Sequence, residues 1–84
     1  MTTATVKLYA SLGDYLPAGA IKNAIEISLP NEATILSTLD RLHVPREHCH
    51  LVLLNGEFVS PSARANCAVK DGDTIAVWPP VAGG

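Results

Sequence analysis

The sequence has 84 residues, 48% of them hydrophobic, and a formal net charge of −2. This length allows one domain and excludes two, and the apolar content supports a core, which excludes a disordered chain. The six basic residues are spread singly along the chain without a basic run, so nucleic acid is not expected as a partner.

Neither a membrane span nor a secretion signal is predicted. The longest apolar runs have four residues, whereas a spanning helix needs roughly 20. The N-terminal residues lack the basic and apolar regions of a signal peptide. Cys49 and Cys67 are expected to be reduced, buried or half-buried thiols, because a core this aliphatic needs no disulfide. The expected compartment is the cytoplasm.

The first predicted strand covers residues 5–10, where Val6, Leu8 and Ala10 share one face. The next residues, Ser11-Leu12-Gly13-Asp14, match a capping box and predict a short helical turn through Leu16. Residues 17–20 read as a loop. Residues 24–29 alternate again and predict a strand antiparallel to the first.

The main helix is predicted to begin after Thr34, the expected N-cap. Its apolar stripe repeats at helical spacing and consists of Ile35, Leu36, Leu39 and Leu42. Because Pro45 pushes Val44 out of the helical region, the helix is expected to end near His43.

The second half of the chain predicts three more strands. Residues 51–54 are apolar at every position and predict a central strand. Asn55-Gly56 predicts a tight hairpin turn, and residues 57–59 are predicted to form the second strand of that hairpin. After a loop over residues 60–66 and a turn at Asp71-Gly72-Asp73, residues 74–78 form the last strand. The order predicts an α+β fold with a mixed sheet and one main helix on one face.

An expected partner surface follows from residues 51–54. A strand without a polar face needs cover on both sides, and the single helix covers one. Trp78 lies on the opposite face of its predicted strand from Ile75 and Val77. It is therefore either part of the core or an interface anchor, and we favour the interface. The predicted interface residues are Leu51, Val52, Leu53, Leu54, Phe58 and Trp78.

The segment 79–84 is predicted to be a flexible tail behind a domain of residues 1–78. Pro79 and Pro80 should end strand pairing, because they lack the N–H of a sheet ladder. Val81 and Ala82 follow, and six residues allow a reach of about 20 Å. Gly83 and Gly84 could pass through a narrow channel, and the carboxylate of Gly84 is the chemical candidate. The competing interpretation is a frayed terminus without function.

These features resemble the ThiS/MoaD family of ubiquitin-like sulfur carriers. The resemblance rests on Pro79-Pro80-Val81-Ala82-Gly83-Gly84, Leu54-Asn55-Gly56-Glu57 and Asp71-Gly72-Asp73-Thr74-Ile75. Within the family, the tail is most similar to the small subunit of molybdopterin synthase. The resemblance implies a β-grasp (ubiquitin-like) roll.

The resemblance also implies a function. An E1-like adenylyltransferase would use ATP to adenylate Gly84, and a sulfur donor protein would convert it to a thiocarboxylate. A larger synthase subunit would then use the sulfur to build molybdopterin, for the molybdenum or tungsten cofactor. The chain itself would not be an enzyme and would bind no cofactor. A carrier for thiamin, cysteine or another sulfur metabolite, and a modifier joined to lysines through Gly84, are the alternatives.

Other chemistries are less well supported by the sequence. The residues His43, His48, Cys49, His50 and Cys67 lack the paired spacing of zinc sites, so no metal is expected. A Cys–His nucleophile pair would need a pocket and an oxyanion site, for which 84 residues with one helix offer little room. No phosphate-binding glycine loop is present in the sequence, so a partner is expected to bind ATP.

Overall fold

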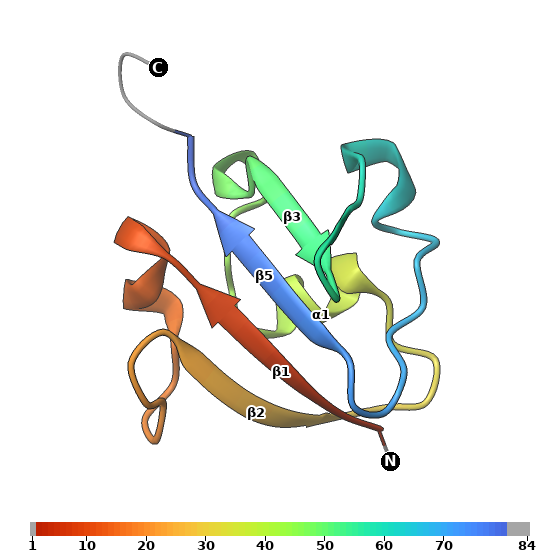
Figure 1. The fold of residues 1–84 in the computed structure, drawn as a ribbon, viewed down its shortest axis with the longest axis horizontal. Coiled ribbons are helices and arrows are strands. Elements are labelled where there is room, and N and C mark those ends of the chain that lie inside the picture. The colour runs from red at the N-terminus through yellow and green to blue at the C-terminus, as the bar shows by residue number, and fades with distance from the viewer. Residues whose placement is uncertain (1, 81–84) are drawn as a thin grey trace.

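The computed structural model describes residues 2–80. Its mixed sheet has five strands, and one α-helix packs on one face (Figure 1). The elements in chain order are β1 (Thr2–Leu8), the 3₁₀ helix η1 (Ala10–Tyr15), β2 (Ala24–Leu29), α1 (Ile35–Arg41), η2 (Arg46–His48), β3 (Leu51–Leu54), β4 (Glu57–Phe58), η3 (Pro61–Ala63) and β5 (Thr74–Trp78). The predicted α+β roll is confirmed.

The strand order in the sheet is β2-β1-β5-β3-β4. β1 and β5 are parallel, and the other neighbouring pairs are antiparallel. β5 therefore occupies the centre of the sheet, and the prediction that residues 51–54 form the central strand is wrong. β3 has β5 on one side and only the two-residue β4 on the other, which its apolar sequence does not reveal.

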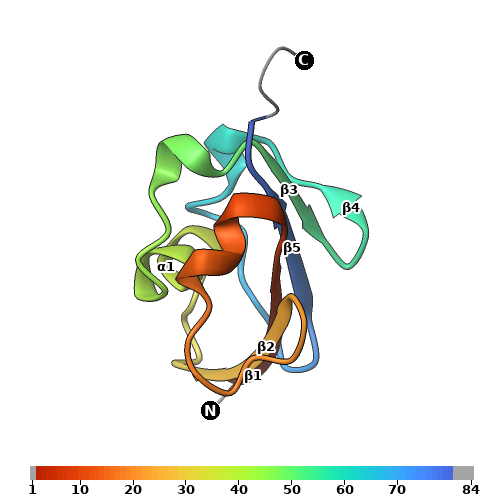
Figure 2. The ribbon, with the colours of Figure 1, turned by 90° about the vertical axis from the view of Figure 1, so that its left-hand side faces the viewer.

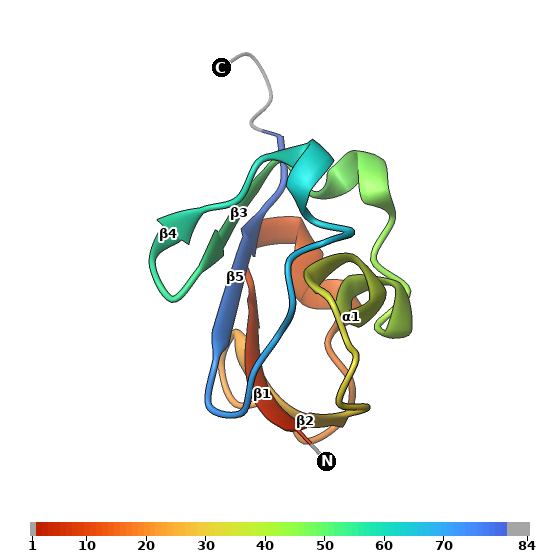
Figure 3. The same ribbon diagram turned by 90° about the vertical axis from the view of Figure 1, so that its right-hand side faces the viewer.

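The core lies between the sheet and α1. Figures 2 and 3 show the sheet from its edges, with α1 and η1 on the same side. The largest fully buried side chains come from both layers and include Val6, Leu8, Leu12, Ile35, Leu39, Val52, Ile75 and Val77. Burying these aliphatic side chains supplies the main driving force for folding.

The chain leaves β1 differently from the prediction. β1 ends at Leu8, and Ala10 has a φ of 53° and an exposed side chain, so it does not extend the buried face. η1 begins at Ala10 with Tyr9 as its N-cap and no side-chain cap. The capping box predicted at Ser11 and Asp14 is therefore wrong, because the first turn starts two residues earlier and Leu12 N–H donates to the Tyr9 carbonyl.

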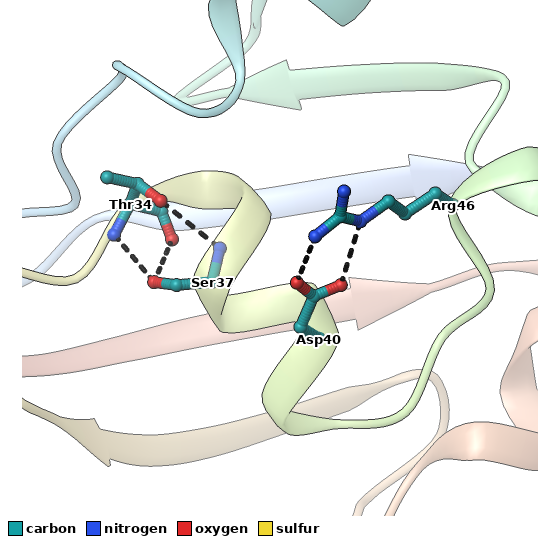
Figure 4. A network of polar contacts seen from close by, with 4 residues as sticks. All are labelled: Thr34, Ser37, Asp40 and Arg46. Carbon is teal, nitrogen blue, oxygen red and sulfur yellow. Dashed lines mark hydrogen bonds and ion pairs between the residues drawn. The ribbon is translucent and has the colours of Figure 1, made fainter.

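The main helix begins where the sequence predicts. Figure 4 shows Thr34 Oγ1 accepting from Ser37 N–H at 3.1 Å and Ser37 Oγ accepting from Thr34 N–H at 2.9 Å. This reciprocal pair satisfies backbone donors that a helix start leaves free. Thr38, which the predicted stripe omits, is fully buried and donates its hydroxyl hydrogen to the Thr34 carbonyl at 2.7 Å.

α1 ends at Arg41, two residues before the predicted end. Leu42 is the C-cap, and His43 adopts a left-handed φ of 62°, which turns the chain before Pro45. Arg46 then pairs with Asp40, with 2.7 Å between Nη2 and Oδ2 (Figure 4). This hydrogen-bonded pair lowers the pKa of Asp40 and links η2 to α1.

The two predicted turns meet at one end of the sheet. Asn55 and Gly56 have φ values of 51° and 86°, as a tight hairpin with two left-handed residues requires. The side-chain amide of Asn55 donates to Asp73 Oδ1 at 2.9 Å and accepts from Thr74 N–H at 2.9 Å. Asp73 Oδ2 also accepts from Lys70 N–H at 2.7 Å. These contacts lock the β3–β4 hairpin to the start of β5.

Candidate functional site

The last described residues of the chain form what we call the tail root, residues 77–80. Backbone donors from both sides hold its two carbonyls: Tyr9 N–H donates to the Val77 carbonyl at 3.1 Å, and His50 N–H donates to the Trp78 carbonyl at 3.0 Å. Pro79 and Pro80 then supply no N–H, so the ladder stops at Trp78 as predicted. The chain thus leaves the sheet from a point pinned by both neighbouring segments.

Aromatic stacking adds a third contact at the tail root. The rings of Tyr9 and Trp78 lie parallel, with centroids 4.4 Å apart and an interplanar angle of 5°. Both side chains are half-buried. Such a pair contributes roughly 0.5–1.5 kcal/mol beyond the area it buries, so the residue that precedes η1 and the end of β5 are held together.

Register decides which apolar side chains face away from α1. Leu51 lies opposite Trp78, Leu53 lies opposite Ala76, and Leu53 also pairs with Phe58. Directly paired residues point to the same face of a sheet. We call Leu51, Leu53, Phe58, Ala76 and Trp78 the apolar patch. Phe58 is 61% exposed, and the other four are half-buried.

The prediction of the interface residues is therefore wrong for Val52 and less well supported for Leu54. Val52 is fully buried opposite Val77 and faces α1, so it is not available to a partner in the folded chain. Leu54 lies opposite Ile75 and packs, half-buried, against the core. An apolar run over 51–54 conceals this alternation, because both faces of β3 are apolar.

The rest of the outer sheet face is polar. Thr5 lies opposite Glu26, and Thr3 lies opposite Ser28. Lys7 lies beside Ala76 across the β1–β5 pair, at the border with the apolar patch. The outer face thus has its polar residues mainly on β1 and β2, together with Thr74 at the start of β5, and the apolar patch on the rest of β5 and on β3 and β4.

Hollows in the described surface lie around the loop before β2, and one of them reaches Lys7 and Tyr9 at the border of the apolar patch. Their walls are formed by Thr5, Lys7, Tyr9, Gly19, Ile21, Lys22, Asn23, Ala24, Ile25 and Glu26. Ile21 is 77% exposed. These walls contain no cysteine, serine or histidine.

The cysteines and histidines do not assemble into a site within residues 2–80. Cys49 is buried, and its Sγ contacts the Pro45 carbonyl at 3.5 Å. Burial raises the pKa of the Cys49 thiol, which disfavours the reactive thiolate. Cys67 is half-buried. Within this range, no three or more histidine, cysteine, aspartate or glutamate side chains gather as metal ligands.

One buried side chain near the tail root escaped the sequence analysis. Arg64 follows η3 in the segment predicted as a polar loop, yet it is only 5% exposed. Its Nη1 donates to the Cys49 carbonyl at 2.8 Å, and its Nη2 donates to the His50 carbonyl at 3.3 Å. A single arginine in an irregular segment carries no periodic signal, so only the contacts reveal its role.

Four of the predicted site residues, Val81, Ala82, Gly83 and Gly84, lie outside the described residues. Pro79 is half-buried and Pro80 is exposed. Within the described part of the chain, no helix has the length and apolar character needed to span a bilayer.

Comparisons with known proteins agree with this geometry. The ThiS family model matches residues 7–84. SAMP1 (small archaeal modifier protein 1) of Haloferax volcanii is 26% identical, with a TM-score of 0.67 over 98% of this chain and 99% of its own. No match was found among curated proteins.

Two further solved structures share the fold. A putative molybdopterin converting factor subunit 1 of Pyrococcus furiosus has a TM-score of 0.69 at 23% identity, covering 96% of this chain and 100% of its own. The thiamine biosynthesis protein ThiS of Geobacter metallireducens has a TM-score of 0.66 at 22% identity, covering 99% and 100%. The family match, the β-grasp sheet and the pinned tail root place this chain in the ThiS family of ubiquitin-like sulfur carriers and modifiers.

Proposed function

We propose that this chain is a sulfur carrier for molybdopterin biosynthesis, and that the carboxyl group of Gly84 is the group that carries the sulfur. The observation that carries the proposal is the tail root. Two backbone hydrogen bonds and two prolines end β5 at a fixed point, so the described chain reaches Pro80 from a defined position. A carrier needs such a start if its last residue is to reach another protein's active site.

The chemistry proceeds in three steps on partner proteins. First, the Gly84 carboxylate attacks the α-phosphate of ATP in an E1-like adenylyltransferase, forming an acyl-adenylate and releasing pyrophosphate. Second, the sulfur of a donor persulfide attacks the acyl carbon and AMP leaves. Reduction of the resulting acyl disulfide by a thiol then frees the thiocarboxylate. The carrier supplies the acyl group and its position, and the partners supply ATP binding, sulfur and catalysis.

The apolar patch is the proposed docking surface for these partners. It includes Trp78, which is also a residue of the tail root. An exposed aromatic side chain flanked by half-buried aliphatic ones is typical of a binding hot spot. Docking at this patch would place the activating site within the roughly 20 Å that the last six residues can span.

A second candidate function is protein modification, in which Gly84 forms an isopeptide bond with a lysine of another protein. The 26% identity to SAMP1 over 98% of the chain supports this candidate. Both candidates use the same acyl-adenylate and differ in the nucleophile that follows: sulfur in one and an amine in the other. A carrier for the thiamin pathway is a third use of the same chemistry, with a fold relative in ThiS.

Intact-protein mass spectrometry of the chain purified from its own cells tests the proposal. The expected result is a species ending at Gly84 in which one oxygen is replaced by sulfur. Protein from cells lacking the adenylyltransferase is the control and should carry only the carboxylate. Lysine adducts without any thiocarboxylate would overturn the sulfur-carrier proposal in favour of modification, and a chain that continues past Gly84 without trimming would overturn both.

The pathway is tested by reconstitution. The thiocarboxylated chain, mixed with a molybdopterin synthase large subunit and the sulfur-free pterin precursor, should yield the dithiolene product. The matched control is the same chain with one alanine added after Gly84, which keeps the domain and moves the acyl carbon by one residue. Sulfur transfer to a thiamin precursor in place of the pterin would contradict the assignment to molybdopterin.

A further inference from the structure

Arg64 is a buried cation whose position demands an explanation. The residue as a whole is only 5% exposed. The salt bridge found in residues 2–80 joins Arg46 to Asp40 and does not involve Arg64. Its Nε–H also lacks an acceptor within that range. Burying a charge without a paired carboxylate is costly, so a stability role alone would be served better by an apolar side chain.

The backbone of Arg64 is fixed by α1. Its carbonyl accepts a hydrogen bond from Leu36 N–H, in the first turn of the helix, at 3.1 Å. Ile35 N–H likewise donates to the Cys67 carbonyl at 3.0 Å. The segment that carries Arg64 is therefore docked on the helix, and the side chain extends from a defined position.

From that position the guanidinium reaches the two residues that precede β3, one of which contacts the tail root. It donates to two consecutive carbonyls, those of Cys49 and His50, at 2.8 and 3.3 Å. The N–H of His50 in turn donates to the Trp78 carbonyl at 3.0 Å. The planar fork of arginine suits two adjacent acceptors, whereas lysine offers a single point charge. A continuous set of hydrogen bonds thus runs from α1 through Arg64 and His50 to Trp78.

The two sides of the tail root are held by different means. On the β1 side, Tyr9 supplies a backbone hydrogen bond to Val77 and a ring stacked on Trp78. On the β3 side, His50 N–H donates to the Trp78 carbonyl, and the carbonyl of that same peptide, which belongs to Cys49, accepts from Arg64 Nη1. Loss of the guanidinium would free that peptide on one side only and change the direction in which the chain leaves β5.

We propose that Arg64 is a positioning residue of the tail root: it fixes the peptides of residues 49 and 50 and thereby the exit direction of the segment that ends in Gly84. The effect on acyl transfer rests on the function proposed above, whereas the effect on the tail root itself does not. The exit direction matters because a displacement of about 1 Å at a reacting group can lower a rate by roughly 100-fold.

The structural half is tested by amide hydrogen exchange in Arg64→Met, which keeps the unbranched chain and removes the donors. The His50 amide should exchange at least about tenfold faster, a change of about 1.4 kcal/mol in its opening free energy. The internal reference is the backbone N–H of Asn55, which donates to the Thr74 carbonyl at 2.8 Å at the other end of β3 and β5. Asn55 should keep its wild-type exchange rate.

The functional half uses adenylation kinetics with the activating enzyme. In Arg64→Met, kcat should fall roughly tenfold or more while KM stays within about twofold, because docking is retained and only delivery is impaired. Arg41→Met, which removes an exposed arginine from the last turn of α1, is the matched control and should leave both constants unchanged. Arg64→Lys should restore part of kcat and serves for both measurements if Arg64→Met does not fold.

Three outcomes overturn the proposal. Equal acceleration of exchange at His50 and Asn55 would assign Arg64 to general stability. Unchanged exchange at His50 would show that the guanidinium does not hold the tail root. A loss of kcat as large in Arg41→Met would show that the effect is not specific. If the chain carries no thiocarboxylate in cells, the proposed function fails, yet the exchange result still decides the positioning role.

Discussion

Phe58→Ala should weaken binding of the activating adenylyltransferase without destabilising the chain. Phe58 is one of two large apolar side chains that are mostly exposed in the described residues, and the other is Ile21. Phe58 belongs to the apolar patch, next to Leu53 across the β3–β4 pair. Ile21 lies before β2, outside the patch. The two residues therefore form a matched test of which exposed side chain a partner covers.

The magnitude follows from the exposed area. A phenylalanine side chain has about 200 Å² of surface, so 61% exposure leaves roughly 120 Å² for a partner to cover. At about 25 cal/mol per Å², full coverage contributes at most about 3 kcal/mol, or roughly 100-fold in Kd. The free energy of unfolding should change by less than about 0.5 kcal/mol, because the side chain makes little contact in the free chain.

Isothermal titration calorimetry with the adenylyltransferase measures both variants. The expected result is a Kd raised roughly 10- to 100-fold for Phe58→Ala and unchanged for Ile21→Ala. Thermal unfolding of each variant alone provides the check that the fold is intact. Wild-type affinity in Phe58→Ala, or an equal loss in Ile21→Ala, would refute the assignment of the patch as the docking surface.

Two further predictions concern stability. Leu39→Ala should lower the free energy of unfolding by about 2–5 kcal/mol, because Leu39 is 1% exposed and leaves a core cavity; a loss below about 0.5 kcal/mol in urea unfolding would show that α1 does not bury this face. Asp73→Asn should cost about 1 kcal/mol at pH 7, since the Asn55 amide and Lys70 N–H hold the pKa of Asp73 below its ordinary 3.8. This contribution to stability is present at pH values above 3.8 and is lost as the pH falls through the lowered pKa of Asp73. The melting temperatures of the wild type and of Asp73→Asn should therefore converge in acid. A difference in melting temperature that stays constant with pH would contradict this prediction.

The sequence predicted most elements well because their signals are local. The bounds of β2, β3 and β5 agree with the prediction, since alternation and flanking turn residues lie within a few positions of each strand. The Thr34 N-cap depends on residues three positions apart. The left-handed turn at Asn55 and Gly56 depends on two neighbours. Such features need no knowledge of the rest of the chain.

The errors arose where two local patterns compete or where no pattern exists. Ser11 and Asp14 have the spacing of a capping box, but η1 starts at Ala10, which itself has a positive φ. Residues 51–54 are apolar throughout, so the sequence could not separate buried Val52 from the outward Leu51 and Leu53. Both cases were decided by how β1 and β3 pair with β5.

By itself, then, the sequence determined the helix, the strands, the hairpin and the proline stop after Trp78, because each depends on the conformational preferences of nearby residues. Tertiary structure alone decided that β5 is central, which side chains make up the apolar patch, and that Arg64 reaches the peptides of residues 49 and 50. These features join segments far apart in the chain, and only the packing of the sheet against α1 brings those segments into contact.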